Sequence, residues 1–241
     1  MNYNILFYIF VIISVNLNYQ YLLPEYLIPF SFITYWITGI FDMVIRKFNF
    51  FEKYKVKNPR PDSLTELDLL PTLMINMILS YLFFNIFYIN YTIRGLVIPK
   101  TMPSFLTIIT ETIVYSIIYD IVFYIGHYIL HLPIFYKYHK KHHITRASIG
   151  ISAFYMDKID FFLEGILPIS LALYIYNGNI VSSFSFLIIG SINTVITHMS
   201  YNFPFIPYST EHLTHHLELK CNYGIGFMDH LLGTRVRRDY K

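Results

Sequence analysis

The sequence is poor in cysteine and in charge, and each shortage excludes a class of protein. Cys221 is the single cysteine, so no disulfide can form within the chain, which fits a site on the reducing, cytosolic side of a membrane. Charged residues make up only 14% of the chain, and a formal net charge of +3 gives no case for a nucleic-acid partner. The chain is instead 55% hydrophobic, with a mean hydropathy of +0.46, which indicates a membrane protein.

Long apolar runs predict membrane helices, because about 20 such residues span a bilayer. Four runs are long enough: 3–23, 26–45, 66–91 and 105–131. A fifth run, 161–196, is broken by Pro168 and Asn177-Gly178-Asn179, so we expect a tight hairpin or two re-entrant helices there. A signal peptide is the alternative for 3–23, but no Lys or Arg precedes that run. The expected fold is an all-α integral membrane protein with about four transmembrane helices and a short membrane hairpin.

Positive charge is distributed unevenly along the chain. Lys and Arg concentrate in 46–60, 137–158 and 235–241. Such residues favour the cytosolic side of a membrane. We therefore expect the histidine-rich part of the chain to form a cytosolic cap on the membrane helices.

Nine of the ten histidines fall in four clusters. Spacings of three and four residues place side chains on one helix face, so each cluster can aim its imidazoles at one point. A lone histidine is usually a hydrogen-bonded core residue, but that does not explain two copies of the spacing HxxHH. Nine imidazoles exceed what one ion takes, so they predict a site for two transition metals. The predicted ligands are His127, His131, His139, His142, His143, His198, His212, His215 and His216.

A carboxylate accompanies the first cluster. Asp120, Tyr124, His127 and His131 form one continuous stripe of a helix. An unpaired carboxylate within an apolar run is costly. We expect Asp120 to accept a hydrogen bond from the free ring nitrogen of a metal-bound histidine, as carboxylates beside metal sites commonly do. The alternative is pairing with an unrelated Arg or Tyr.

The histidine motifs and their flanking residues resemble the fatty acid hydroxylase superfamily of membrane di-iron sterol and lipid oxidases. The resemblance covers about 120–237 and includes the HxxxH motif, both HxxHH motifs and the stretch FYKYHKKHH. HMSYNFPF, from His198, is similar to the sterol branch, notably cholesterol 25-hydroxylases and C-4 methyl sterol oxidases. CNYGIGFMDHLLGT, from Cys221, is similar to the closing motif of the family. Within these two stretches, we expect Asn202 and Asp229 to support the metal ligands.

Asn202 lies four residues after His198, so on a helix both would face the metals. The alternative is an ordinary capping Asn before Pro204. His230 stands where the family has Arg or Lys and receives no ligand role. Met228 replaces a Trp, Ser200 replaces a Gly, and Asp157-Lys158-Ile159-Asp160 replaces His-Pro-x-Glu or His-Pro-x-Asp.

The resemblance implies an O2-dependent oxidase of the endoplasmic reticulum membrane. Its cofactors would be two iron ions, which zinc can replace on purification, with electrons from NAD(P)H through cytochrome b5 or a similar reductase. The substrate would be a sterol or related lipid hydroxylated at an unactivated carbon. Region 1–104 would supply N-terminal membrane helices and a cytosolic loop, and region 105–241 the catalytic region, within one structural domain. The alternatives are a sterol or lipid desaturase, a fatty acyl hydroxylase, a non-enzymatic zinc or haem protein, and a lipid-binding protein without catalysis.

Overall fold

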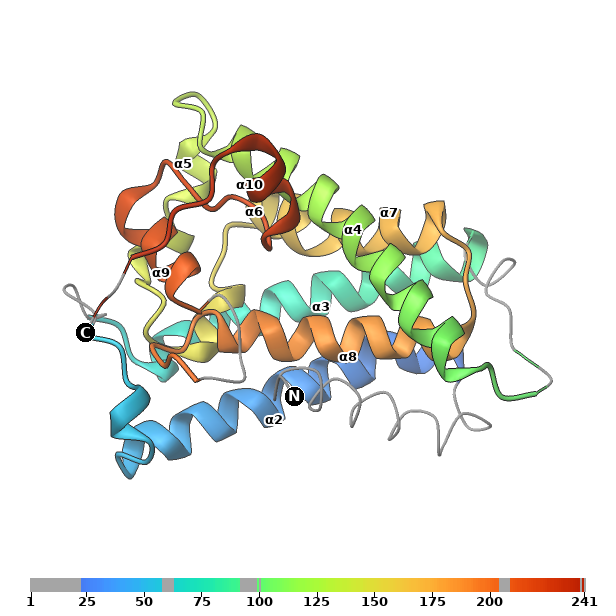
Figure 1. The fold of residues 1–241 in the computed structure, drawn as a ribbon, viewed down its shortest axis with the longest axis horizontal. Helices are drawn as coiled ribbons and strands as arrows, with labels where there is room; N and C mark the ends of the chain where they lie inside the picture. The colour runs from blue at the N-terminus through green and yellow to red at the C-terminus, as the bar shows by residue number, and fades with distance from the viewer. Residues whose placement is uncertain are drawn as a thin grey trace.

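A computed structural model describes residues 23–57, 63–91, 99, 101–203, 209–238 and 240. These residues form an all-helical protein (Figure 1). The expected membrane helix at 3–23 falls almost wholly outside them. Three described helices are long and apolar enough to cross a membrane, at Pro24–Lys47, Glu66–Ile86 and Phe105–Leu130. The predicted all-α membrane fold with a histidine-rich region is therefore confirmed.

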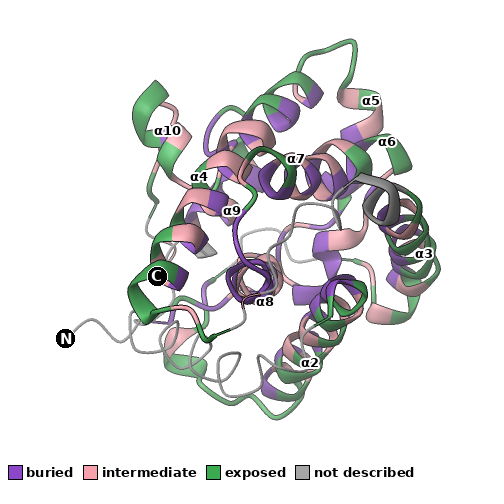
Figure 2. Cartoon of the chain, turned by 90° about the vertical axis from the view of Figure 1, so that its right-hand side faces the viewer, coloured by how far each residue is buried: buried purple, intermediate pink, exposed green. Residues whose placement is uncertain are grey.

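The long helices α2 (Leu27–Lys47), α3 (Glu66–Tyr91) and α4 (Phe105–Leu130) surround α8 (Ile180–Ile196). Figure 2 shows α8 in the middle of the bundle, with the other helices around it. Every residue from Ile180 to Leu187 is buried, as expected of a helix that is packed on all sides. Ser182, Ser183 and Ser185 are among them, and such small side chains let helices approach closely.

The outer faces of the long helices are apolar and exposed. Ile37 on α2, Ile78 on α3 and Leu106 on α4 are 63%, 53% and 72% exposed. Apolar side chains in this position suit a surface that lipid covers. The bundle therefore has an apolar core and an apolar outer surface, as expected of a membrane domain.

The run 161–196, for which a tight hairpin or two re-entrant helices was expected, contains two short helices. Its helices α7 (Leu167–Ile175) and α8 have 9 and 17 residues, both shorter than a full span. α7 packs mainly against α4, whereas α8 packs mainly against α2 and also against α4. Oε2 of Glu111 on α4 accepts hydrogen bonds from the backbone N–H and the side-chain amide of Asn179, which caps α8. This half-buried carboxylate thus anchors the connection between α7 and α8 to the end of α4 far from His127.

The long helices alternate in direction, so one end of the molecule carries most of the basic segments. The last turn of α2, with Arg46 and Lys47, and the first turn of α3 lie at the same end as the C-terminus of α4 (Figure 1). The remaining helices of the described part gather at this end. They are α5 (Tyr136–His139), α6 (Lys158–Phe161), α9 (Ser209–Glu218) and α10 (Phe227–Leu232).

We predict that this end faces the cytosol, because Lys and Arg flank it. A glycosylation acceptor engineered beside His143 or after Arg238 should stay unmodified when the protein is made in the endoplasmic reticulum. Glycan attachment would be read as a mobility shift that a glycosidase reverses. A shift at either position would place the cap in the lumen and contradict the prediction.

Candidate metal centre

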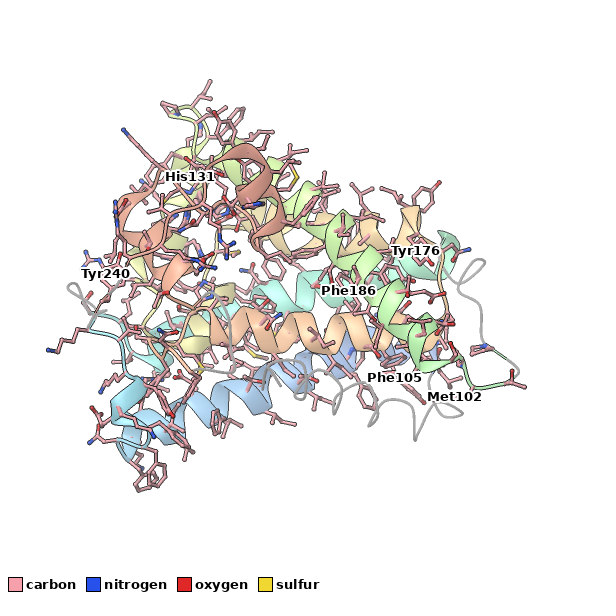
Figure 3. All side chains as sticks on the ribbon, in the orientation of Figure 1. Met102, Phe105, His131, Tyr176, Phe186 and Tyr240 are labelled. Carbon is pink, nitrogen blue, oxygen red and sulfur yellow. The ribbon has the colours of Figure 1, made fainter. Side chains whose placement is uncertain are left out.

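The nine clustered histidines meet at the cap end of the bundle and form two groups. Within each group the ligand nitrogens all lie within 4.8 Å of one another. Figure 3 shows side-chain nitrogens concentrated at the end marked by His131, away from Phe105. The five-histidine group contains His127, His131, His139, His143 and His215, and the four-histidine group contains His142, His198, His212 and His216. The structure therefore brings together all nine histidines that the sequence singled out.

Each HxxHH motif divides its histidines between the two groups. In the motif at 139–143, the first and last histidines join the five-histidine group and His142 joins the other. In the motif at 212–216, the first and last join the four-histidine group and His215 crosses over. The expectation that each cluster aims at one point was therefore wrong for these motifs. The histidines three and four positions after the first one of a motif point in different directions, so one motif can contribute to both histidine groups.

The imidazoles reach the centre from helix ends and short turns. His127 and His131 lie on the last turn of α4 and at its C-terminal cap. His139 ends α5, and a 3-10 turn at His142–Ile144 carries the next two ligands. α9 carries the final motif, while His198 follows the end of α8. The ends of several helices thus converge on one site.

All the close contacts between rings are made by Nε2 atoms. Neighbouring Nε2 atoms are 2.9–3.3 Å apart in the five-histidine group. The range is the same in the four-histidine group. Metal–nitrogen bonds of about 2.0–2.1 Å place neighbouring ligands roughly 3.0–3.4 Å apart around an ion. The spacing of the nitrogens therefore fits a coordination shell.

Four of the rings are oriented by backbone carbonyls. Nδ1 of His127 donates to the carbonyl of Tyr223, and Nδ1 of His215 to the carbonyl of Cys221, both at 2.6 Å. Nδ1 of His198 donates to the carbonyl of Thr194, and Nδ1 of His216 to the carbonyl of Thr145, both at 2.8 Å. A carbonyl only accepts, so the ring hydrogen is on Nδ1. Nε2 then carries a lone pair that points into the centre. Such partners fix the tautomer of metal ligands.

The pair of His127 and His139 shows why a cation is needed. Their Nε2 atoms lie 3.1 Å apart. The Nδ1 atom of His127 donates to a carbonyl, and that of His139 lies 2.9 Å from Oδ1 of Asp160. Both Nε2 atoms therefore carry lone pairs, which repel at this distance unless a cation lies among them. The donor set is that of a transition-metal site.

Burial keeps the rings neutral. It lowers the pKa of His131 to about 3 and that of His198 and His215 to about 4. At neutral pH these imidazoles therefore retain the lone pair that a metal requires. His230 is exposed and lies in neither group, in agreement with its having no predicted ligand role.

Asp120 does not make the predicted bond to an imidazole within the described part of the chain. Its carboxylate accepts hydrogen bonds from the backbone N–H groups of Ile225 and Met228, at 2.6 and 2.8 Å. The stripe argument placed it on the correct face of α4, but the polypeptide segment before α10 lies between it and the rings. Asp120 therefore acts on the metal ligands through the backbone.

Asp229 also forms hydrogen bonds with the segment before α10. It is buried, and its carboxylate accepts hydrogen bonds from the N–H groups of Tyr223 and Gly224 and from the hydroxyl of Thr234. The carbonyls of Cys221 and Tyr223 are the ones that orient His215 and His127. Two buried aspartates thus hold the 221–228 segment, and this segment holds two ligands of the five-histidine group. We call it the closing segment.

Asn202 is not placed as predicted. The chain leaves helical conformation after Ile196, and the side chain of Asn202 is exposed. Its backbone N–H donates to the carbonyl of Tyr54, while the neighbouring Tyr201 forms an isolated β-bridge with Lys55. The spacing of four residues from His198 therefore does not bring Asn202 to the metals, because no helix connects them.

Two acidic residues at the site were missed by the sequence reasoning. Asp160, which bonds His139, stood in a stretch noted only as a departure from the family pattern. Glu164 lies four residues later and approaches both His127 and His139. The signal available in the sequence was the acidic pair at spacing i, i+4 in an otherwise apolar stretch, which places both on one helix face.

Comparison with known proteins gives a family match. A model described as fatty acid hydroxylase matches residues 112–234, which is about half of the chain and includes all nine ligands. Two curated proteins called fatty acid hydroxylase domain-containing protein 2, from Homo sapiens and Macaca fascicularis, are each 36% identical over 104 residues. That stretch is 42% of this chain and 31% of each relative, so the match spans about a third of their length. No solved structure matches the chain.

Proposed function

Because this chain belongs to the fatty acid hydroxylase family, we propose that it is an O2-dependent di-iron membrane oxidase that hydroxylates a sterol or related lipid at an unactivated carbon. The observation that carries the proposal is the convergence of nine Nε2 atoms in two adjacent groups at the end of apolar helices. Bound iron supplies the redox chemistry with O2 that protein side chains do not offer.

The protein's own residues hold, orient and shield the metals. Backbone carbonyls keep the Nε2 lone pairs aimed inward, and seven of the nine rings are buried, which keeps bulk water from the centre. The exposed apolar faces of α2, α3 and α4 support a site beside the bilayer. A substrate that stays dissolved in the membrane suits this position better than a water-soluble one.

The proposal includes electron supply from NAD(P)H through cytochrome b5 or a similar reductase, and a location in the endoplasmic reticulum with the cap in the cytosol. The resemblance to the family supports both, and the basic segments around the cap support the orientation. A structural zinc protein is a poorer reading, because structural zinc sites are closed sets of four ligands, usually with cysteine. Nine histidines and one cysteine are far from that pattern.

A desaturase or a fatty acyl hydroxylase of the same family would use the same ligands. The stretch His198–Phe203, with its resemblance to the sterol branch, is what favours a sterol. Support for its involvement comes from His198, which belongs to the four-histidine group, and from Met199, Tyr201 and Phe203, which are buried in one apolar cluster. The proposal keeps the sterol as the preferred substrate on this ground.

Lipid analysis tests the activity and the substrate together. The chain is expressed in cells that lack their own sterol C-4 or side-chain oxidase, beside a His142→Ala variant of equal abundance. We expect new hydroxysterols with the intact chain and none with the variant. New hydroxy-acyl lipids with unchanged sterols would defeat the sterol assignment, new double bonds would favour the desaturase, and identical profiles would contradict an oxidase acting on membrane lipids.

A further inference from the structure

Glu164 is a buried carboxylate at the edge of the five-histidine group. Its Oε1 atom lies 3.7 Å from Nε2 of His127 and 3.4 Å from Nδ1 of His139. The residue is only 3% exposed, and Oε1 has no hydrogen-bond partner. The atom is therefore directed at the metal ligands without being satisfied by any of them.

No lysine or arginine of the described chain compensates a negative charge on Glu164. Within the described part of the chain, neither Glu164 nor the neighbouring Asp160 forms an ion pair with a lysine or arginine. Oδ2 of Asp160 is also buried and without a hydrogen bond. Burying carboxylates without compensation is strongly unfavourable, so such groups are paired or coordinate a metal.

The backbone is shaped to bring Glu164 to this place. Residues Phe162–Ile166 form a π-helical turn between α6 and α7. Single π-turns of this kind widen a helix locally and recur at functional sites. Gly126 of α4 faces the turn, and a Cβ atom there would lie 3.0 Å from the carbonyl oxygen of Leu163. Because Gly126 has no side chain, the π-helical turn can pack closely against α4 directly before His127.

We propose that Glu164 is a further ligand of the five-histidine group, with Oε1 binding the same metal ion as His127. The proposal rests on the di-metal centre of the proposed function. Around an ion with bonds of about 2.1 Å, ligand atoms are separated by roughly 3.0 Å when adjacent and roughly 4.2 Å when opposite. The separation of 3.7 Å between Oε1 and Nε2 of His127 lies between these limits.

The two metal positions then differ in charge. The four-histidine group is formed by imidazoles alone, and no carboxylate of the described chain joins it. The five-histidine group shares His139 with a second set of close ligand atoms, formed by His139, Asp160 and Glu164. With Glu164 as a ligand, it would also have Asp160 behind His139. The ion in the four-histidine group would be held by neutral nitrogens only, and the ion in the five-histidine group by nitrogens and a carboxylate. The carboxylate favours a harder or more highly charged ion in the five-histidine group.

Zinc binding to the full chain in detergent tests the proposal in two backgrounds. Replacing His212 and His216 by alanine disables the four-histidine group, and replacing His131 and His215 disables the other. Glu164→Gln is added to each, and zinc affinity is measured by chelator competition. In the background without His212 and His216, Glu164→Gln should weaken zinc affinity by about 10–100-fold or more, the size seen when a partner of a metal ligand is lost. In the background without His131 and His215, the zinc affinity should be unchanged.

Glu111→Gln is the matched control, because Glu111 is a half-buried glutamate of α4 about 24 Å along the helix from His127. It should change zinc affinity in neither background. An equal effect of Glu164→Gln in both backgrounds, or no effect in the first, would overturn the proposal. Failure of the parent nine-histidine chain to bind two ions would instead count against the di-metal centre itself.

If a histidine background does not fold, the same comparison is made in the nine-histidine chain. Glu164→Gln should then lose one of its two ions at a chelator concentration at which Glu111→Gln retains both. Glu164→Asp keeps the charge but is one methylene shorter, so it should lose the same ion. Retention of both ions by Glu164→Gln would overturn the proposal in this format as well.

Discussion

Replacing both His212 and His216 by alanine should lower the metal content of the purified chain from two ions to one and abolish lipid oxidation. These residues are half of the four-histidine group. The remaining pair, His142 and His198, offers too few nitrogens to hold a transition metal against competition from buffer and chelator. The five-histidine group keeps every ligand, so its ion should stay.

Metal is counted by elemental analysis on monodisperse protein, with unfolding temperature as a check on folding. His230→Ala is the control, because His230 is the exposed histidine outside both groups and its loss should leave two ions. Two ions in the double variant, or a single ion in the folded parent chain at full occupancy, would refute the assignment of two metal positions.

Asp120→Asn should weaken metal binding at the five-histidine group by about 10–100-fold while the chain still inserts into membranes. The carboxylate accepts one backbone N–H on each oxygen. An amide can accept only on its oxygen, so either Ile225 or Met228 loses its partner and faces an NH2 group. A buried donor left without a partner costs about 1–3 kcal/mol. The closing segment, with the carbonyls that orient His127 and His215, should loosen as a result.

The comparison needs a control in which the same change is harmless. Asp68→Asn provides it, since Asp68 is exposed on α3 and distant in sequence from every ligand. Zinc affinity is measured for both variants, with the four-histidine group as an internal reference within each protein. Metal loading of Asp120→Asn equal to that of the parent chain would show that the closing segment does not depend on this carboxylate.

The membrane helices and the ligand list could be predicted because both depend on side-chain type and local spacing. Apolar runs gave α2, α3 and α4, and the clusters named the nine histidines. The division of each HxxHH motif between two ions could not be predicted, since it depends on how α9 and the turn at His142–Ile144 are rotated relative to each other. That rotation is set by packing between segments far apart in the sequence.

The supporting groups were harder to identify for a related reason. Four ligands are oriented by backbone carbonyls, which every residue possesses, so no residue type marks them. Asn202 was misplaced because the helical spacing from His198 was applied where no helix exists. The spacing of Asp160 and Glu164 indicates that both lie on one helix face. Their distance from the histidines, however, depends on a π-helical turn that the pattern of apolar residues does not indicate.

The closing segment also affects the order in which the protein can be assembled during translation. All nine histidines precede Cys221 in the chain, so every ligand leaves the ribosome before the carbonyls that orient His127 and His215. A nascent chain at that stage has its full set of imidazoles but not the tautomers and directions that select an ion. Early capture would therefore favour whichever cytosolic metal binds loose histidines best. We therefore expect correct metal loading to follow the step in which Asp120 and Asp229 fix the segment, after the chain has been synthesised.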